Sequence, residues 1–107
     1  MTTFDEREET FEKKFVHDEQ LRFKAEARRN RLLGLWVAEK LGKAGSEADA
    51  YAKEVVVAEF DGRGGDGVIR KVMADLAAKG VAIEESEIRA KMAELMLLAT
   101  SQVKAGV

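Results

Sequence analysis

The stretch DEREETFEKKFVHDEQLRFKAEARRNRLLGLWVAEKL (residues 5–41) contains no proline and only one glycine, Gly34. Most of its residues are good helix formers, and without a breaker they predict one long helix. The stretch leads into LGKAG (residues 41–45), where Gly42 and Gly45 can take the left-handed backbone conformation that ends helices. A helix of this length is long for a chain of 107 residues, so it dominates the predicted fold.

The rest of the chain predicts three shorter helices separated by turns. Ser46 can cap a second helix that runs toward Phe60. Asp66 can cap a third helix, which Gly80 ends. A fourth helix begins near Ser86.

Apolar residues in these three helices recur at the spacing of one helix face. In the second helix they are Ala48, Tyr51, Ala52, Val55 and Val56, and in the third Ile69, Val72, Met73 and Leu76. In the fourth they are Ile88, Met92, Leu95, Met96 and Ala99, with Leu97 and Leu98 widening the stripe. Short-linked amphipathic helices bury such faces most simply against one another, so we predict an all-α fold, an antiparallel four-helix bundle.

The composition excludes several classes of site. The chain has no cysteine and one histidine, which leaves no disulfide, no thiol nucleophile and no histidine cluster for a metal. We therefore expect no metal, no cofactor and no catalytic activity. The acidic N-terminus MTTFDEREE lacks the features of a signal peptide, and no stretch is long and apolar enough to cross a membrane, which predicts a cytoplasmic protein. A net charge of −2 argues against binding to nucleic acid.

Charge and aromatic residues set the N-terminus apart. Residues 5–12 hold five acids and one base, whereas residues 22–31 hold five bases and one acid. On a helical wheel Phe4, Phe11 and Phe15 fall within about 40° of one another, a thin stripe suited to a partner's groove. We therefore predict an N-terminal arm, residues 1–18, and a bundle domain, residues 19–107. Packing of the three phenylalanines in the bundle core fits their spacing equally well.

A glycine-rich stretch offers an alternative function. In GRGGDG (residues 62–67), Gly62, Gly64 and Gly67 have the spacing of a dinucleotide-binding loop, after the β-branched run VVVAEF and before a helix. A second strand at residues 81–83 followed by an acid would complete that pattern. The alternative function is therefore a small helical nucleotide-binding module, and it requires a parallel pair of strands around the glycines. If the glycines only form a turn between two helices, no strand is needed. A purely structural adaptor is a further alternative.

Four segments together resemble one known family, the zeta inhibitor subunit of alphaproteobacterial F-type ATP synthases. They are FDEREETFEKKFVHDEQLRFKAEARRNRLLGLWVAEKLG from Phe4, AYAKEVV from Ala50, GVIRKVMADL from Gly67 and SEIRAKMAEL from Ser86. The opening segment is the most specific, with four phenylalanines and the Ala-Arg-Arg-Asn run in register. The glycine-rich turn departs from the family pattern, which is acidic there and carries a proline.

The resemblance implies a four-helix bundle that binds the catalytic head of the ATP synthase, at its alpha, beta and gamma subunits, and blocks rotation in the direction of ATP hydrolysis. The free protein is then expected to be a monomer, located at the inner membrane only through the ATP synthase, without inserting into the membrane. The implied contact residues are Phe4, Asp5, Arg7, Glu8, Phe11, Glu12 and Phe15 of the arm, together with Arg28 and Arg29 of the basic stretch.

Overall fold

The computed structural model describes residues 19–62 and 65–106 of the chain. Over these residues the chain forms helices and no strand, which confirms the predicted all-α bundle. The elements are α2 (Glu19–Lys40), α3 (Ser46–Ala58), the short 3₁₀ helix η1 (Glu59–Asp61), α4 (Asp66–Ala78) and α5 (Glu85–Lys104). The predicted first helix is thus confirmed from residue 19 onward, and its residues 5–18 lie outside the described part.

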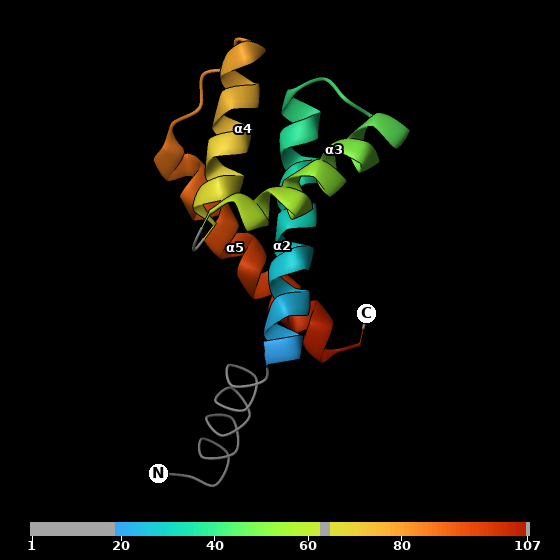
Figure 1. Ribbon diagram of the computed structural model, residues 1–107. Coiled ribbons are helices and arrows are strands. Elements are labelled where there is room, and N and C mark those ends of the chain that lie inside the picture. Colours follow the sequence, from blue (N-terminus) through green and yellow to red (C-terminus); the bar gives the residue numbers. More distant parts are fainter. Residues whose placement is uncertain (1–18, 63–64, 107) are drawn as a thin grey trace, which may run out of the picture.

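Helix α2 is the centre of the bundle. Helices α3 and α5 pack against it, and α4 packs against α3, η1 and α5 (Figure 1). In Figure 1 helices α2 and α4 run upward and α5 runs obliquely back down, in the antiparallel sense, whereas α3 crosses α2 from right to left. Because α2 contacts every other helix of the described part, it positions the surfaces described below.

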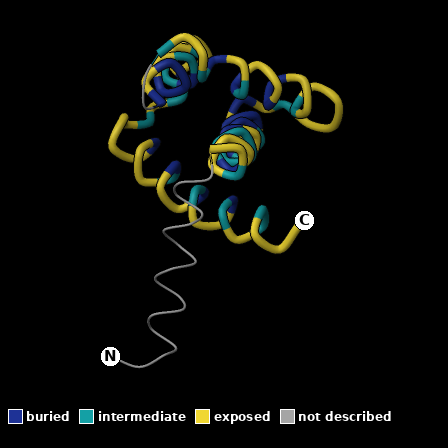
Figure 2. Tube along the Cα trace, turned by 60° about the horizontal axis from the view of Figure 1, so that its bottom comes forward, coloured by how far each residue is buried: buried dark blue, intermediate teal, exposed yellow. Residues whose placement is uncertain are grey.

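The core is built from apolar side chains of α2, α3, α4 and α5. Figure 2 shows the buried segments facing the interior between the helices and the exposed ones facing outward. Full burial of a Leu, Ile or Val side chain contributes about 1.5–3 kcal/mol relative to exposure, so this cluster supplies most of the stability. The largest fully buried apolar side chains are Leu33, Val37, Val55, Val68, Val72, Leu76 and Ile88.

Two helix ends follow the predicted glycine signals. Gly42 and Gly80 both have positive φ, +77° and +78°. After each of them the next amide bonds back into the helix, from Lys43 to the carbonyl of Ala38 at 2.9 Å and from Val81 to that of Leu76 at 2.9 Å. These are Schellman ends, in which glycine takes the left-handed conformation without a steric penalty.

The predicted helix starts are wrong by one residue. Ser46 and Asp66 are already the first helical residues, and the capping positions are Gly45 and Gly65, without a side-chain capping bond. Gly45 and Gly65 have φ values of +56° and +86°, which glycine adopts readily. Backbone geometry therefore decides where these helices begin.

Gly34 lies in the middle of α2 where α3 crosses it. A Cβ atom placed on Gly34 would lie 2.6 Å from the Cα of Ala52 and 3.2 Å from its Cβ. This glycine therefore permits close approach of two helix backbones and does not interrupt α2. Together α2 and α3 form the most extensive helix pair in the described part.

The predicted stripe of α5 is confirmed in part. Ile88, Met92, Leu95 and Ala99 are buried, but Leu97 and Leu98 are 77% and 46% exposed, so the predicted widening of the stripe is wrong. The reason is that α2 and α4 cover only one side of this helix. None of the helices in the described ranges is long and apolar enough to cross a membrane.

Candidate partner-binding surface

The structure describes the surface that borders the predicted arm. The arm's contact residues Phe4, Asp5, Arg7, Glu8, Phe11, Glu12 and Phe15 lie outside the described residues. The bordering surface is formed by the first turns of α2, which begins at Glu19, with the end of α3 on one side and the end of α5 on the other. Arg28 and Arg29, the two remaining predicted contact residues, lie in this part of α2.

Arg29 belongs to a polar cluster that joins α2 to η1. Asn30 is 1% exposed, and its Nδ2 donates a hydrogen bond of 2.9 Å to Oε2 of Glu59. The Arg29 guanidinium donates through Nε to Oδ1 of Asn30 at 3.0 Å and lies 3.3 Å from the same Glu59 oxygen. The Arg29 side chain is only 13% exposed, so its charge interacts mainly with Glu59 inside the protein. Its predicted contact with a partner stays a prediction.

Arg28 and Arg31 line a separate basic hollow of about 610 Å³ beside α2. Arg28 donates to the Gln102 side chain of α5 at 3.5 Å. Lys24 adds a third base, and the apolar part of the lining comes from Leu21, Ala27, Val56 and Val103. Three bases around an apolar floor suit an acidic protein surface that also offers apolar side chains.

The glycine-rich turn is explained by packing between α3 and α4. A Cβ atom on Gly67 would overlap the carbonyl oxygen of Ala58, and one on Gly62 would lie 2.7 Å from the amide nitrogen of Gly67. Arg70 closes the turn by donating to the carbonyl oxygen of Asp61 at 3.1 Å. The nucleotide-binding alternative requires a parallel strand pair, and this prediction is wrong. Residues 51–58 are helical, and residues 81–84 form neither helix nor strand.

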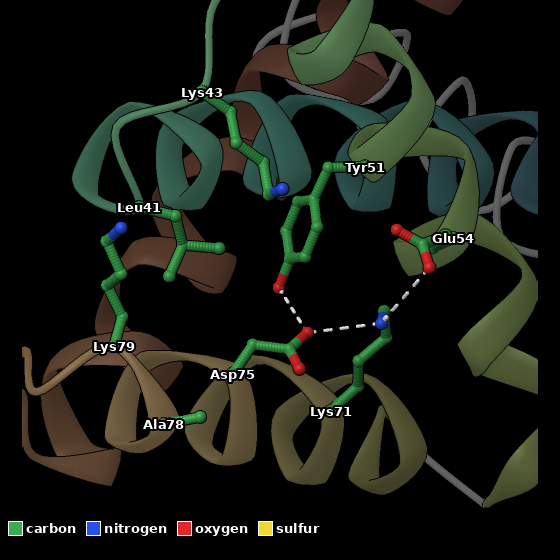
Figure 3. Close-up of a pocket in the computed structure, with 8 residues that line it drawn as sticks. All are labelled: Leu41, Lys43, Tyr51, Glu54, Lys71, Asp75, Ala78 and Lys79. Carbon is green, nitrogen blue, oxygen red and sulfur yellow. Dashed lines mark hydrogen bonds and ion pairs between the residues drawn. The ribbon is translucent and has the colours of Figure 1, made fainter.

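A second polar group connects α3 to α4 around a hollow of about 340 Å³. Figure 3 shows the Tyr51 hydroxyl pointing at Asp75, to which it donates a hydrogen bond of 2.8 Å. Lys71 lies 3.1 Å from the same Asp75 oxygen and 3.9 Å from Glu54. Burial first, and then the hydrogen bond to Asp75, raises the pKa of the Tyr51 hydroxyl above its ordinary value. Tyr51 is therefore a stable hydrogen-bond donor that ties the two helices together.

Comparison with known proteins places these features in a family. Residues 1–102 match the sequence profile of the family described as ATPase inhibitor subunit zeta. The chain belongs to this family. A protein whose structure was solved by solution NMR is 53% identical to this chain, with a TM-score of 0.71, covering 81% of this chain and 99% of the other. No match was found among curated proteins.

In this zeta-family chain the Ala-Arg-Arg-Asn run has two orientations. Asn30 points into the protein with Arg29 beside it, whereas Arg28 lines the basic hollow. In the sequence the run belongs to one basic stretch, and nothing there indicates that Glu59 is the acid that pairs with Arg29 and Asn30. No local sequence signal predicts the contact between Asn30 and Glu59, because the two residues are 29 positions apart.

Replacing Tyr51 with phenylalanine is expected to lower the free energy of unfolding of this zeta-family chain by about 1 kcal/mol at pH 7, because it removes one hydrogen bond. The pKa of Tyr51 is raised in the folded protein, so above about pH 10 the unfolded chain loses the tyrosine proton first. The stability contribution of the hydroxyl is therefore complete below pH 10 and declines as the pH rises further. Urea unfolding of both forms between pH 7 and 11 measures this difference, and a constant difference would contradict the prediction.

Proposed function

We propose that the chain inhibits ATP hydrolysis by the F-type ATP synthase through its arm, residues 1–18. In this mechanism the arm wedges between a catalytic and a non-catalytic subunit of the head, next to the central stalk, and blocks rotation in the hydrolytic direction. The observation that carries the proposal is the family match, which begins at residue 1 and therefore includes the whole arm together with the bundle. The chain acts as a regulator bound to the ATP synthase and not as an enzyme.

The described residues share one hydrophobic cluster, which is consistent with the proposed bundle domain. Within the described ranges, the buried apolar residues begin at Ala25 and end at Ala99. Most of them, from Leu33 to Leu95, pack against one another in a single cluster drawn from α2, α3, α4 and α5. A chain that begins at residue 19 therefore retains these residues, and we expect it to fold.

Each group of arm residues has a distinct role in this mechanism. Phe4, Phe11 and Phe15 fill apolar pockets of the partner, and burial of such aromatic side chains provides most of the binding energy at an interface. The carboxylates of Asp5, Glu8 and Glu12 meet basic partner residues and guide the approach. Outside the arm, Lys24, Arg28 and Arg31 offer a basic surface for acidic groups of the head near the point where the arm enters between the two subunits.

Deletion of residues 1–18 is expected to abolish inhibition while leaving the bundle folded. The measurement is ATP hydrolysis by the cognate catalytic head, stripped of its own inhibitor, with increasing amounts of the full chain or of the form that begins at residue 19. Circular dichroism of both forms confirms their helix content. Equal inhibition by the two forms would show that the arm is not the inhibitory element.

A matched pair of point variants serves as the control for the arm. Lys13 lies opposite the phenylalanine stripe on a helical wheel, so K13A tests the same segment without removing an aromatic side chain. F11A is expected to raise the half-inhibitory concentration about 30-fold, which corresponds to about 2 kcal/mol. K13A is expected to change it by less than about fivefold, as for a single charge at an interface rim. Similar effects of F11A and K13A would contradict the assigned stripe.

A further inference from the structure

Two phenyl rings on the outside of the bundle touch each other. Phe23 of α2 is 61% exposed and Phe60 of η1 is 72% exposed, yet their ring centroids lie only 6.4 Å apart. We call these two residues the phenyl patch. Scattered single apolar side chains are common on surfaces, but a contiguous aromatic patch indicates an interaction surface.

A small apolar pocket opens between the two rings. It has a volume of about 160 Å³ and is lined by Phe23, Phe60, Ala27 and Val56, together with Glu26, Asn30 and Glu59. A cavity of roughly 150 Å³ holds a benzene-sized group, so this pocket fits one apolar side chain and not a nucleotide.

The two carboxylates that line this pocket have partners within the protein. Glu26 forms an ion pair with Arg22 at 3.3 Å, and Glu59 forms one with Arg29 at 3.3 Å. Glu59 also accepts the hydrogen bond from buried Asn30. Paired charges around an apolar centre resemble the polar rim of a protein interface, in which the centre receives an apolar anchor.

The position of the patch connects it to the arm. Phe23 lies about 6 Å along the helix axis from Glu19, the first described residue of α2 after the arm. Any partner that holds residues up to 18 therefore approaches this end of α2. The patch is the nearest exposed aromatic surface of the described bundle to that junction.

The size of the patch indicates whether it binds a second copy of this chain or forms one part of a larger interface with another protein. From the area of aromatic side chains and the exposed fractions of Phe23 and Phe60, the two rings offer roughly 270 Å² of contact. A stable pairing of two proteins buries about 800 Å² per partner, so the patch alone is too small to hold a dimer. It is large enough to extend the interface proposed for the arm.

We propose that the phenyl patch is a second docking contact for the catalytic head of the ATP synthase. It seats on the head beside the entrance of the arm, and its pocket receives one apolar side chain of the head. This inference rests on the proposed function, and it adds a contact made by the folded bundle. The patch orients the bundle so that the arm enters its site, and loss of the patch weakens binding without changing the arm.

The test compares a double variant in the patch, F23S/F60S, with the control variant L97S. Leu97 on α5 is 77% exposed, so both variants replace exposed apolar side chains by serine in the full chain. Binding of each chain to the immobilised head is measured beside inhibition of ATP hydrolysis. F23S/F60S is expected to raise both the Kd and the half-inhibitory concentration at least about tenfold. L97S is expected to change neither, and the melting temperatures of both variants stay close to that of the wild type.

The outcomes separate this inference from the proposed function. If the wild type inhibits through its arm but F23S/F60S binds and inhibits as well as the wild type, the patch is not a docking contact and the proposed function stands. If the wild type binds without inhibiting, the proposed function fails, and the Kd of F23S/F60S still decides whether the patch docks. If sedimentation shows that the wild type pairs with itself and F23S/F60S does not, the occupant is a second copy and the inference is overturned. Absence of binding by every form overturns both.

Discussion

Replacing Gly34 with alanine is expected to lower the melting temperature of the bundle by about 10–20 °C, which corresponds to about 2–3 kcal/mol for a domain of this size. The added Cβ would lie 2.6 Å from the backbone Cα of Ala52, so a side-chain rotation cannot relieve the contact and α2 and α3 must separate. Overpacking of this kind costs about 1–3 kcal/mol or more. Alanine is the better helix former by up to about 1 kcal/mol, so helix propensity alone predicts the opposite sign.

The sign of the change therefore distinguishes the two explanations of Gly34. Thermal unfolding followed by circular dichroism gives the melting temperatures of G34A and of E39A, a control at an exposed position of the same helix. E39A is expected to change the free energy of unfolding by less than about 0.5 kcal/mol. A G34A chain that melts at or above the wild-type temperature would show that the two helices have room for a side chain here.

Gly34 also illustrates which part of the fold the sequence could predict. Helix positions and ends follow from local signals, as at Gly42 and Gly80, whose Schellman bonds need only neighbouring residues. The crossing of α2 and α3 depends on Ala52, a residue 18 positions away from Gly34, and spacing along one helix does not encode it. A glycine inside a strong helix pattern predicts either a break or a close contact, and only the structure decides which.

In the candidate site, too, features that depend on neighbouring residues could be predicted, whereas contacts between residues far apart in the sequence could not. The positions of Arg28 and Arg29 on α2 could be predicted, but their different uses could not, since these depend on Gln102 and Glu59. The second helix was predicted to run toward Phe60, whereas α3 ends at Ala58 and η1 follows, which leaves the Phe60 ring exposed beside Phe23. The contact of these rings is a property of two helices together, so neither segment alone indicates it.

Replacing Glu59 with alanine is expected to reduce the free energy of unfolding by about 3 kcal/mol, the second large change in stability. It removes the acceptor of the Asn30 amide, which is 1% exposed, and an unpaired buried amide costs about 1–3 kcal/mol. It also leaves the Arg29 guanidinium, 13% exposed, without the carboxylate that lies 3.3 Å away. Breaking a pair by removing one partner costs more than the pair contributes, because the remaining charge stays desolvated.

Two further variants show which part of Glu59 carries this effect. E59Q keeps an oxygen that can accept from Asn30 and is expected to cost about half as much as E59A. E54A removes an acid from α3 whose side chain is 62% exposed and whose partner Lys71 lies 3.9 Å away, so it should cost less than about 1 kcal/mol. Urea unfolding of the three variants gives the order, and an equal cost for E59A and E54A would contradict the role of the cluster. Because Phe60 follows Glu59 directly in η1, the bonds of Glu59 to α2 also keep Phe60 beside α2, where its ring centroid lies 6.4 Å from that of Phe23.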